Sequence, residues 1–431
     1  MRLTVHPAAL ALGGRYRPPG DKSVSHRAAI LGGLAGGETE IHGFLDSADT
    51  RATLGAMQQL GARVEESGGV IRIRGGSLKP PAGPLDLGNS GTGIRLLAGA
   101  LAGHPDLQGA AIELVGDESL SRRPMARIIE PLARMGARIQ SRDGRAPLVI
   151  EPSKLTGRRH TLSVASAQVK SAILLAGLFA EGETVVVEPG VSRDHTERML
   201  PAFGVGLHDG EPGVAVSGGQ VLSGTRIKVP GDLSSAAFAL AAGLLVGGSA
   251  IQLEGIGLNP TRSGFVDIVR HMGAQVAIEG DRTDGGEPLG RLTVEGSALA
   301  GIDIAPEQVP LAIDEFPLIM ALAAAAEGVT RIRGASELRV KESDRIAVMC
   351  RELARLGVAV EELDDGAVVT GGPVRGGEVD SHGDHRVAMS LAVLALVAEA
   401  PVTIDNAEWI ETSYPGFVED IRALGAEMVW E

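Results

Sequence analysis

The tripeptide Leu60-Gly61-Ala62 ends an amphipathic stretch of this 431-residue chain. The same phrase, an apolar residue followed by glycine and then alanine or valine, returns five more times, with its glycine at positions 136, 204, 273, 357 and 425. A glycine directly after the last apolar residue is the usual C-terminal cap of an α-helix. The steps between these glycines are 75, 68, 69, 84 and 68 residues, so the chain is predicted to contain six similar α/β units.

Each unit also contains an earlier apolar stretch, rich in alanine and leucine on all sides, which is typical of a fully buried helix. We expect these helices at residues 26–34, 94–101, 169–179, 236–246, 318–326 and 387–397. Several end at a glycine-containing turn that leads into β-rich runs at 184–187, 250–253 and 329–332. Six units of helix, strand, helix, strand, strand fit two globular α/β domains of three units each.

The second helix of each unit is predicted from an apolar residue at every third or fourth position. Before Gly136 this pattern uses Met125, Ile128 and Leu132, and it places Pro124 in the first turn of the helix. Near Gly357 the helix is expected to open around residues 339–345, with Lys341 and Arg345 on one face.

Composition excludes several classes of protein. There are 40 Lys and Arg against 54 Asp and Glu, a net charge of −14, which argues against nucleic acid or an anionic membrane as the main partner. The single cysteine, Cys350, excludes an internal disulfide and a multi-cysteine metal site, and it lies on the apolar side of its helix. No signal peptide and no apolar run of about 18 residues is evident. We therefore expect a cytoplasmic chain, a monomer, with no metal and no cofactor.

Polar residues collect where the buried helices are predicted to begin, as in the segments 20–27, 88–92, 166–170, 314–317 and 384–386. Helix capping explains their Ser, Asn and Asp. It does not explain Lys22, Arg27 or Arg386, because a cation near a helix N-terminus opposes the helix dipole. A cation and a hydroxyl at a helix N-terminus are what an anion site needs.

The second helices begin with further charge, in the segments 119–125, 192–198 and 339–345. A solvated, salt-bridged helix start explains one such cluster, but three clusters at the same phase of a repeat favour a site. Familiar motifs are missing from the sequence: there is no phosphate loop, no dinucleotide fingerprint, no nucleophile elbow and no zinc-binding histidine pair.

Together these segments resemble the signatures of the EPSP synthase family, in order over nearly the whole chain. They are residues 19–27, 88–92, 166–168, 192–197, 338–345 and 384–386. The resemblance implies a two-domain inverse α/β barrel of six βαβαββ units, three per domain, with the buried helices pointing their N-termini at the cleft between the domains. It also implies a discontinuous domain, 1–18 plus 230–431, that contains the N-terminal strand and units four to six. Units one to three form the domain 19–229.

The resemblance implies transfer of the enolpyruvyl group of phosphoenolpyruvate to the 5-hydroxyl of shikimate 3-phosphate, with release of phosphate, in aromatic amino-acid biosynthesis. Asp314 is then the proton acceptor, Glu342 the proton donor, and Lys22 contacts both substrates. The shikimate 3-phosphate ligands implied are Lys22, Ser23, Arg27, Ser166, Gln168, Arg193, Asp314 and Lys341. The phosphoenolpyruvate ligands implied are Lys22, Gly91, Arg123, Gln168, Arg345 and Arg386.

Two positions depart from the usual pattern of the family. Thr412 stands where many members have a lysine of the phosphoenolpyruvate site, and Arg193 stands where others have serine. Both features resemble a divergent bacterial branch, in which tolerance of glyphosate is linked to alanine at the position of Gly91. Since glycine leaves that space open, we expect glyphosate to inhibit.

Three rival classes share some of these features. The sister transferase that acts on UDP-N-acetylglucosamine has the same fold but usually uses a loop cysteine, whereas Cys350 is predicted in a helix core. A non-catalytic α/β-repeat binding protein would not need Asp314 and Glu342 beside the cations. An RNA 3′-phosphate cyclase would need a nucleotidylation histidine, and the net charge disfavours RNA.

Overall fold

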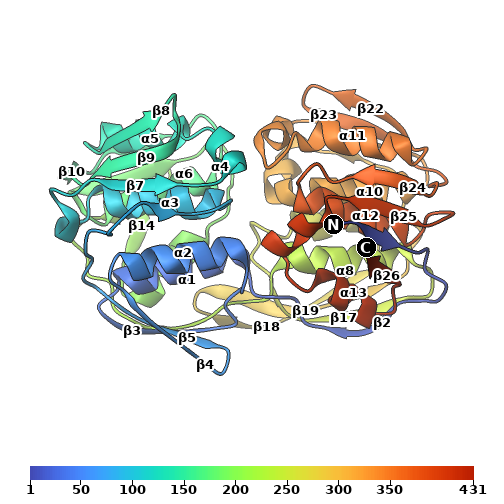
Figure 1. Ribbon diagram of the computed structural model, residues 1–431, viewed down its shortest axis with the longest axis horizontal. Coiled ribbons are helices and arrows are strands. Elements are labelled where there is room, and N and C mark those ends of the chain that lie inside the picture. Colours follow the sequence, from blue (N-terminus) through green and yellow to red (C-terminus); the bar gives the residue numbers. More distant parts are fainter. The chain divides into compact units, whose positions relative to one another are not determined.

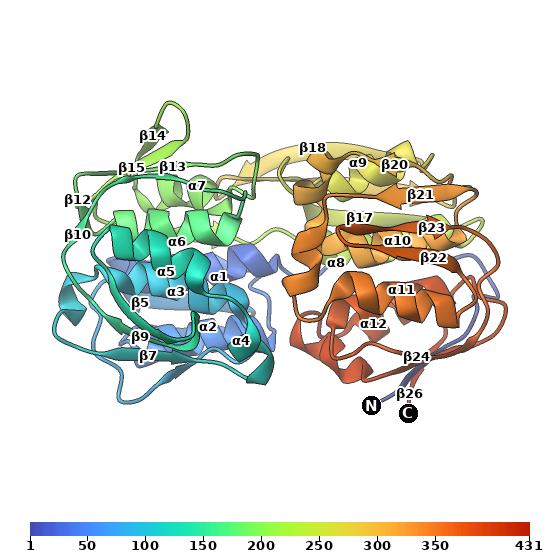
Figure 2. The ribbon, with the colours of Figure 1, turned by 90° about the horizontal axis from the view of Figure 1, so that it is seen from above.

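The structure, a computed structural model, describes residues 1–431 apart from the side chain of Asp281. It divides into two compact units. The N-terminal unit comprises Gly20–Pro230 and Thr283–Glu287, and the C-terminal unit comprises Met1–Pro19, Gly231–Arg282 and Pro288–Glu431. Within each unit, helices run side by side in the interior and sheets lie around them (Figure 1 and Figure 2).

The N-terminal unit contains three four-stranded sheets of one design. In each, the first two strands are parallel and the other neighbours are antiparallel. The strand orders are β16 (Arg226–Lys228), β3 (Gly37–His42), β5 (Val70–Gly75), β4 (Arg63–Ser67); then β6 (Leu85–Asp86), β7 (Ile112–Val115), β9 (Arg145–Glu151), β8 (Arg138–Arg142); then β11 (Arg159–Thr161), β13 (Glu183–Val187), β15 (Val214–Ser217), β14 (Leu207–Asp209). A short parallel pair, β10 (Leu155–Thr156) and β12 (Ala180–Glu181), accompanies them.

The C-terminal unit contains three four-stranded sheets as well. Their members are β18 (Val276–Asp284), β19 (Glu287–Glu295), β17 (Ala250–Gly257), β2 (Gly13–Tyr16); β20 (Asp303–Ile304), β21 (Val329–Ile332), β23 (Gly366–Thr370), β22 (Ala359–Leu363); and β24 (Gly377–Asp380), β25 (Val402–Asp405), β1 (Leu3–Val5), β26 (Met428–Trp430). The first strands of the chain, β1 and β2, thus pair with strands far along the sequence. Six sheets, three in each unit, confirm the sixfold repeat predicted from the glycine spacing.

Six helices are buried along almost their whole length, where the apolar stretches predict them. They are α1 (Lys22–Leu34), α3 (Gly91–Ala102), α6 (Ala167–Gly177), α8 (Leu233–Leu245), α10 (Phe316–Ala325) and α12 (His385–Ala395). Each begins two to four residues before the predicted start, because the polar residues ahead of the apolar pattern are already helical. This extension puts several of the residues singled out above, Lys22 and Gly91 among them, into the first helical turn.

Glycines at the ends of the outer helices and between two of the buried helices fit this architecture. All six glycines of the recurring phrase have positive φ, from +81° at Gly357 to +113° at Gly425, a conformation that side chains disfavour at a helix end. Inside the N-terminal unit, a Cβ atom on Gly99 of α3 would lie 2.1 Å from the carbonyl oxygen of Ala172 on α6. Glycine therefore allows these two buried helices to pack backbone to backbone.

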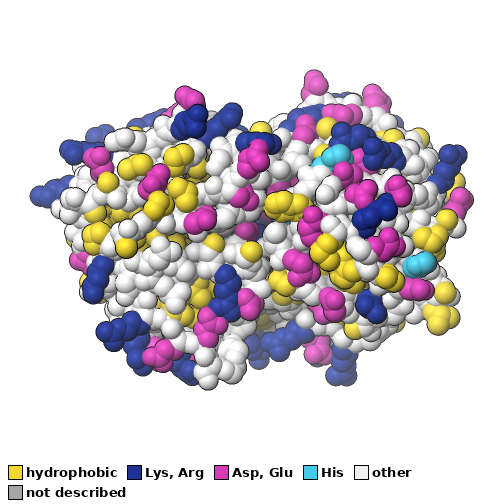
Figure 3. Space-filling model, viewed as in Figure 1, with side chains coloured by type: hydrophobic (Ala, Val, Ile, Leu, Met, Phe, Trp, Pro, Cys, Tyr) yellow, Lys and Arg dark blue, Asp and Glu magenta, His cyan; other side chains and the backbone are white. Residues whose placement is uncertain are grey.

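The outer helices are α2 (Ala48–Gln59), α5 (Ala126–Arg134), α7 (His195–Met199), α9 (Gly264–His271), α11 (Arg345–Arg355) and α13 (Phe417–Ala423). Cys350 lies buried in α11, as its place on the apolar side of the helix predicts. Among the residues described, no helix combines the length and the apolar character needed to cross a membrane. On the face drawn in Figure 3, basic and acidic side chains are interspersed over both units.

Two sequence-based expectations about the outer helices are wrong. Pro124 does not lie in the first turn of a long helix, because a short helix, α4 (Glu118–Arg122), ends before it and α5 starts only at Ala126. Lys341 and Arg345 do not share a helix face. A 3₁₀ turn, η5 (Ser336–Val340), precedes Lys341, and α11 starts at Arg345 with Asp344 as its N-cap. Pro124, and the N-cap hydrogen bond that Asp344 accepts from the Ala347 amide at 3.1 Å, interrupt the helices that apolar periodicity alone suggests.

Candidate functional site

Helix α1 carries three of the predicted ligands, Lys22 and Ser23 in its first turn and Arg27 in its second. Asp21 caps the helix by accepting a hydrogen bond from the Val24 amide at 2.8 Å. The Lys22 ammonium forms an ion pair with Asp49 of α2, a carboxylate that the sequence did not single out. Asp49 holds the lysine tip at the start of the helix, where the lysine charge would otherwise oppose the helix dipole.

Arg27 is buried within α1 and is held by hydroxyl groups. Its guanidinium donates to Thr196 Oγ1 and to Ser171 Oγ, each at 2.7 Å, and to the Ser23 carbonyl oxygen at 3.0 Å. Burial lowers the pKa of Arg27 to about 10, although the nearby Glu197 opposes this shift. The arginine is therefore still charged at neutral pH, and these three hydrogen-bond partners are all neutral oxygens.

The predicted residues Gly91, Arg123 and Gln168 converge at the starts of α3 and α6. Arg123 donates to the Asn89 carbonyl oxygen at 3.3 Å, and Gln168 donates to Thr92 Oγ1 at 2.9 Å. Arg95, which sequence analysis missed, links them by donating to Gln168 Oε1 at 2.7 Å and to the Gly91 carbonyl oxygen at 3.2 Å. An arginine inside an otherwise apolar helix was the available signal for it.

Ser166 is the N-cap residue of α6, and its surroundings contain an ion-pair network absent from the predicted site. Its amide donates to Glu188 Oε1 at 2.9 Å, and that carboxylate also accepts from Ser192 Oγ at 2.7 Å. The buried Lys170 ammonium lies 2.7 Å from Glu188 and 2.8 Å from Glu197. Burial disfavours the charge on Lys170, but the two carboxylates outweigh it and raise the pKa of this lysine. Glu188 thus joins two of the loops that precede helices.

Arg193 lies half-buried just before Asp194, the N-cap residue of α7. The next residue but one, His195, is buried and its Nδ1 lies 2.8 Å from Glu287 Oε1, at the start of β19. The sequence contains no signal for this pair, since the two residues lie 92 positions apart. The pair anchors the segment Thr283–Glu287 to the helix that follows Arg193.

In the C-terminal unit, the predicted carboxylates and cations form one connected cluster. Asp314 Oδ1 lies 3.5 Å from Lys341 Nζ and 3.6 Å from Arg345 Nη1. Arg345 Nη2 donates to Glu342 Oε2 at 2.6 Å, and Arg386 Nη1 donates to the Asp314 carbonyl oxygen at 3.1 Å. All five predicted residues of this unit are therefore brought together.

Two further residues of this cluster were not predicted as site residues. The carboxylate of Asp384, fully buried at the start of α12, accepts from Arg345 Nε at 2.8 Å and from Ser343 Oγ at 3.0 Å. Burial opposes ionisation of Asp384, but the charge of Arg345 outweighs it and lowers the pKa of Asp384. Burial disfavours the charge on Arg345, but the carboxylates of Asp384 and Glu342 outweigh it and raise the pKa of this arginine. Arg262, from the loop before α9, brings a third cation within 3.9 Å of Asp314.

Two further positions singled out in the sequence are Cys350, because of the rival transferase, and Thr412, because it departs from the usual pattern. Burial raises the pKa of Cys350 to about 12, so its thiol is a protonated core group. Thr412 ends a 3₁₀ turn, η6 (Ala407–Thr412), and donates to the Trp409 carbonyl oxygen at 2.7 Å. Its side chain caps that turn and supplies no cation.

The sixfold repeat and the cationic helix starts of both units define a two-domain inverse α/β barrel whose side chains suit anionic substrates. The family model for EPSP synthase (3-phosphoshikimate 1-carboxyvinyltransferase) matches residues 8–421. The chain belongs to the EPSP synthase family.

Named relatives and solved structures agree with this membership. The 3-phosphoshikimate 1-carboxyvinyltransferase of Halorhodospira halophila is 54% identical over 422 residues, covering 96% of this chain and 94% of the relative. That of Acidithiobacillus ferrooxidans is 51% identical over 420 residues, 96% of each chain. The structure of EPSP synthase from Acinetobacter baumannii aligns over 100% of both chains with 44% identity and a TM-score of 0.87.

The predicted fold class, family and enzyme class are thereby confirmed. The chain is an enolpyruvyl transferase of the shikimate pathway, in aromatic amino-acid biosynthesis, whose substrates are phosphoenolpyruvate and shikimate 3-phosphate.

Proposed function

We propose that the thirteen residues predicted from the sequence carry out this enolpyruvyl transfer, and that the residues of both units act on the same pair of substrates. The observation that supports this most strongly is the carboxylate pair Asp314 and Glu342, both in contact with Arg345. A non-catalytic anion binder has no use for two carboxylates beside its cations, whereas this reaction needs a proton acceptor and a proton donor. We further propose that the functional domains are 1–18 plus 230–431 and 19–229, and that the enzyme is a cytoplasmic monomer.

Asp314 is the proposed proton acceptor. The 5-hydroxyl of shikimate 3-phosphate loses its proton to this carboxylate as its oxygen attacks C2 of phosphoenolpyruvate. Lys341, Arg345 and Arg262 lie 3.5–3.9 Å from the Asp314 oxygens, which stabilises the ionised form that a base requires.

Glu342 is the proposed proton donor to the methylene carbon of phosphoenolpyruvate. Arg345 at 2.6 Å stabilises its carboxylate form, so Glu342 has to gain a proton before it can act. An arriving dianion that binds Arg345 would compete for that guanidinium and favour the protonated acid. The tetrahedral intermediate then loses phosphate from C2 and one proton from the methyl group, which restores the C=C double bond and forms the enol ether of the product.

The remaining residues are proposed to hold the two anions. Shikimate 3-phosphate is assigned to Lys22, Ser23, Arg27, Ser166, Gln168, Arg193, Asp314 and Lys341, and phosphoenolpyruvate to Lys22, Gly91, Arg123, Gln168, Arg345 and Arg386. Arginine guanidinium groups suit phosphate and carboxylate because they donate in a planar fork. The contact between Arg95 and Gln168 adds a residue that orients the amide assigned to both substrates.

The test is the release of inorganic phosphate from the purified chain. We expect release only when both substrates are present, and its loss in Asp314→Asn. The matched control is Asp303→Asn, an exposed aspartate of the same unit that pairs with Arg331. Phosphate release by Asp314→Asn at the wild-type rate would contradict the assignment of the base.

A further inference from the structure

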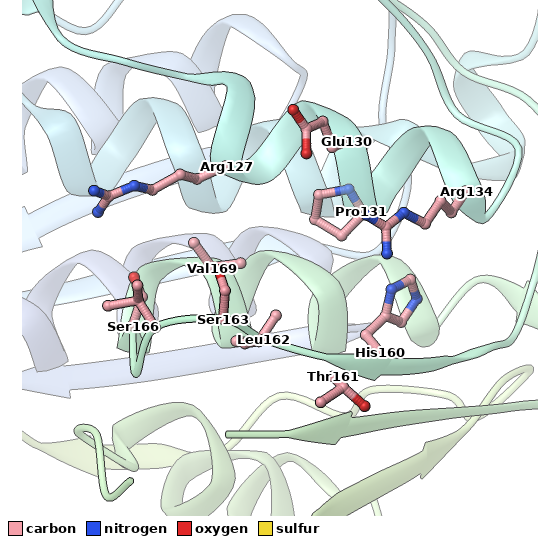
Figure 4. A pocket seen from close by; sticks show the side chains of 11 residues that line it. Arg127, Glu130, Pro131, Arg134, His160, Thr161, Leu162, Ser163, Ser166 and Val169 are labelled. Atoms are coloured by element: carbon pink, nitrogen blue, oxygen red, sulfur yellow. The ribbon is translucent and has the colours of Figure 1, made fainter. Parts of the chain in front are cut away.

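A pocket of the N-terminal unit lies between α5 and the connection that leads from β11 to α6 (Figure 4). Its volume is about 140 Å³, close to the ~150 Å³ cavity that holds a benzene ring in an engineered protein. Pro131, Leu162, Val164 and Val169 supply apolar lining. Ser166 is its only residue in common with the proposed substrate ligands. The pocket therefore adjoins the proposed substrate residues at Ser166 and is otherwise lined by residues that are not assigned to the substrates.

His160 is the unusual group in this lining. Its side chain is 2% exposed, and neither ring nitrogen has a hydrogen-bond partner among the described residues. Burial lowers the pKa of His160, with smaller contributions from Arg134 and Arg158, so at neutral pH the ring offers one N–H donor and one acceptor. A buried polar ring without a partner is costly, and it indicates that something else supplies one.

Arg134 faces His160 across the pocket, from α5 to β11 (Figure 4). It is exposed and makes no ion pair within 4.0 Å with any residue that the structure describes, so its guanidinium is available to a ligand. The lining also contains Arg127 and Glu130. Arg134 therefore supplies the positive charge that faces the buried imidazole, which suits an anionic group.

We propose that this pocket binds a small organic carboxylate, with its carboxylate on Arg134 and His160. The arginine fork and the imidazole N–H can donate to the two carboxylate oxygens. An apolar body the size of a six-membered ring would pack on Pro131, Leu162 and Val169. A compact inorganic anion could contact Arg134 but would leave the apolar lining uncovered.

Benzoate is the probe, titrated into the full-length enzyme by calorimetry with shikimate 3-phosphate present, so that arginines assigned to that substrate are occupied. We expect saturable binding of benzoate and at least tenfold weaker binding of benzamide, which has the same shape without the charge. Inorganic phosphate, titrated separately, should bind this site more weakly than benzoate. Phosphate binding at Arg134 as tight as that of benzoate would overturn the assignment to an organic acid.

Two variants locate the binding. Arg134→Gln should weaken benzoate binding at least tenfold, and because Arg134 is exposed this change leaves the core intact. His160→Gln should weaken it similarly. The matched control is Arg138→Gln, an exposed arginine four residues further on and outside the pocket, which should change binding less than twofold. Absence of saturable benzoate binding, or binding that Arg134→Gln leaves unchanged, would overturn the proposal.

The test is independent of the catalytic assignment. Binding of shikimate 3-phosphate is recorded in its own titration, so loss of that substrate's binding with retained benzoate binding would count against the substrate residues alone. The reverse result, normal substrate binding without benzoate binding, would count against this pocket alone.

Discussion

Two buried arginines, one in each unit, are stabilised in opposite ways. Arg27 of the N-terminal unit donates to Thr196, Ser171 and a carbonyl oxygen, and burial lowers its pKa. Arg345 of the C-terminal unit lies against the carboxylates of Asp384 and Glu342, and its pKa is raised despite complete burial. The first arginine is held by neutral groups and keeps its charge for a ligand. The second is already balanced by protein carboxylates.

We infer from this difference that the two arginines, one in each unit, have different roles in the reaction. A guanidinium that is hydrogen-bonded to hydroxyl groups forms charge-assisted hydrogen bonds when a phosphate binds. The environment of Arg27 therefore suits tight substrate binding. A guanidinium held by carboxylates orients those carboxylates, so the environment of Arg345 suits proton transfer. Variants in the C-terminal cluster should therefore affect turnover or folding, and variants around Arg27 should affect substrate affinity.

The largest effect is expected for Glu342→Gln, which keeps the shape of the side chain and removes its exchangeable acid. Removing a general acid or base typically lowers kcat by about 10²–10⁴-fold. Steady-state phosphate release measures kcat, and titration of both substrates measures their affinity. Normal turnover with unchanged binding would show that Glu342 is not the proton donor and would contradict the proposed difference in role between the two units.

Asp384→Asn should destabilise the C-terminal unit, because it leaves the buried Arg345 without its closest carboxylate. Removing one partner of a buried ion pair costs about 3–5 kcal/mol. Urea unfolding followed by circular dichroism measures the change. The exposed Asp365, paired with Arg333, provides the control Asp365→Asn, which should cost less than about 1 kcal/mol.

The same aspartate predicts an acid limit for stability. Because the pKa of folded Asp384 is lowered below its unfolded value of about 4, the stabilisation is fully present above that pH. It is lost as the pH falls through the lower, folded pKa. Unfolding midpoints measured between pH 7 and pH 3 should fall more steeply for the wild type than for Asp384→Asn. Parallel curves would contradict this origin of acid sensitivity.

Arg27→Gln should act on binding instead of turnover. Hydrogen bonds to charged groups contribute about 1.5–3 kcal/mol, so the KM for shikimate 3-phosphate should rise about 10–100-fold. We expect a smaller change in kcat and little change in the KM for phosphoenolpyruvate. A fall in kcat with an unchanged KM for shikimate 3-phosphate would show that Arg27 acts on turnover, as proposed for Arg345, and would contradict the proposed difference between them.

The smallest effect is expected for Gly91→Ala. A Cβ atom at this position would lie 2.9 Å from Arg95 Nη1 and 3.0 Å from Arg123 Nη1, so two flexible guanidinium ends must shift by a few tenths of an ångström. The wild type should be inhibited by glyphosate, and the variant should need more glyphosate for half-inhibition, with a KM for phosphoenolpyruvate raised several-fold. Wild-type activity that is unaffected up to millimolar glyphosate would contradict the first expectation.

Local signals in the sequence predicted most of the fold. The glycines that end the outer helices need positive φ, and their spacing alone indicates six units. The uniformly apolar stretches predicted the six buried helices, because such stretches are stable only inside a core. The break at Pro124 and the 3₁₀ turn before Lys341 were missed, since apolar periodicity does not register local capping by Asp344 or the backbone limits of proline.

The sequence by itself determined the repeat, the buried helices, the family and the residue types of the site, since these depend on short-range pattern. Only the tertiary structure decided which partners surround each charge. Asp384 lies 39 residues from Arg345, Gln168 lies 73 from Arg95 and Glu287 lies 92 from His195. Spacing along the chain carries no information about such pairs. Burial makes them matter, because inside the protein a charge depends on the few groups that touch it.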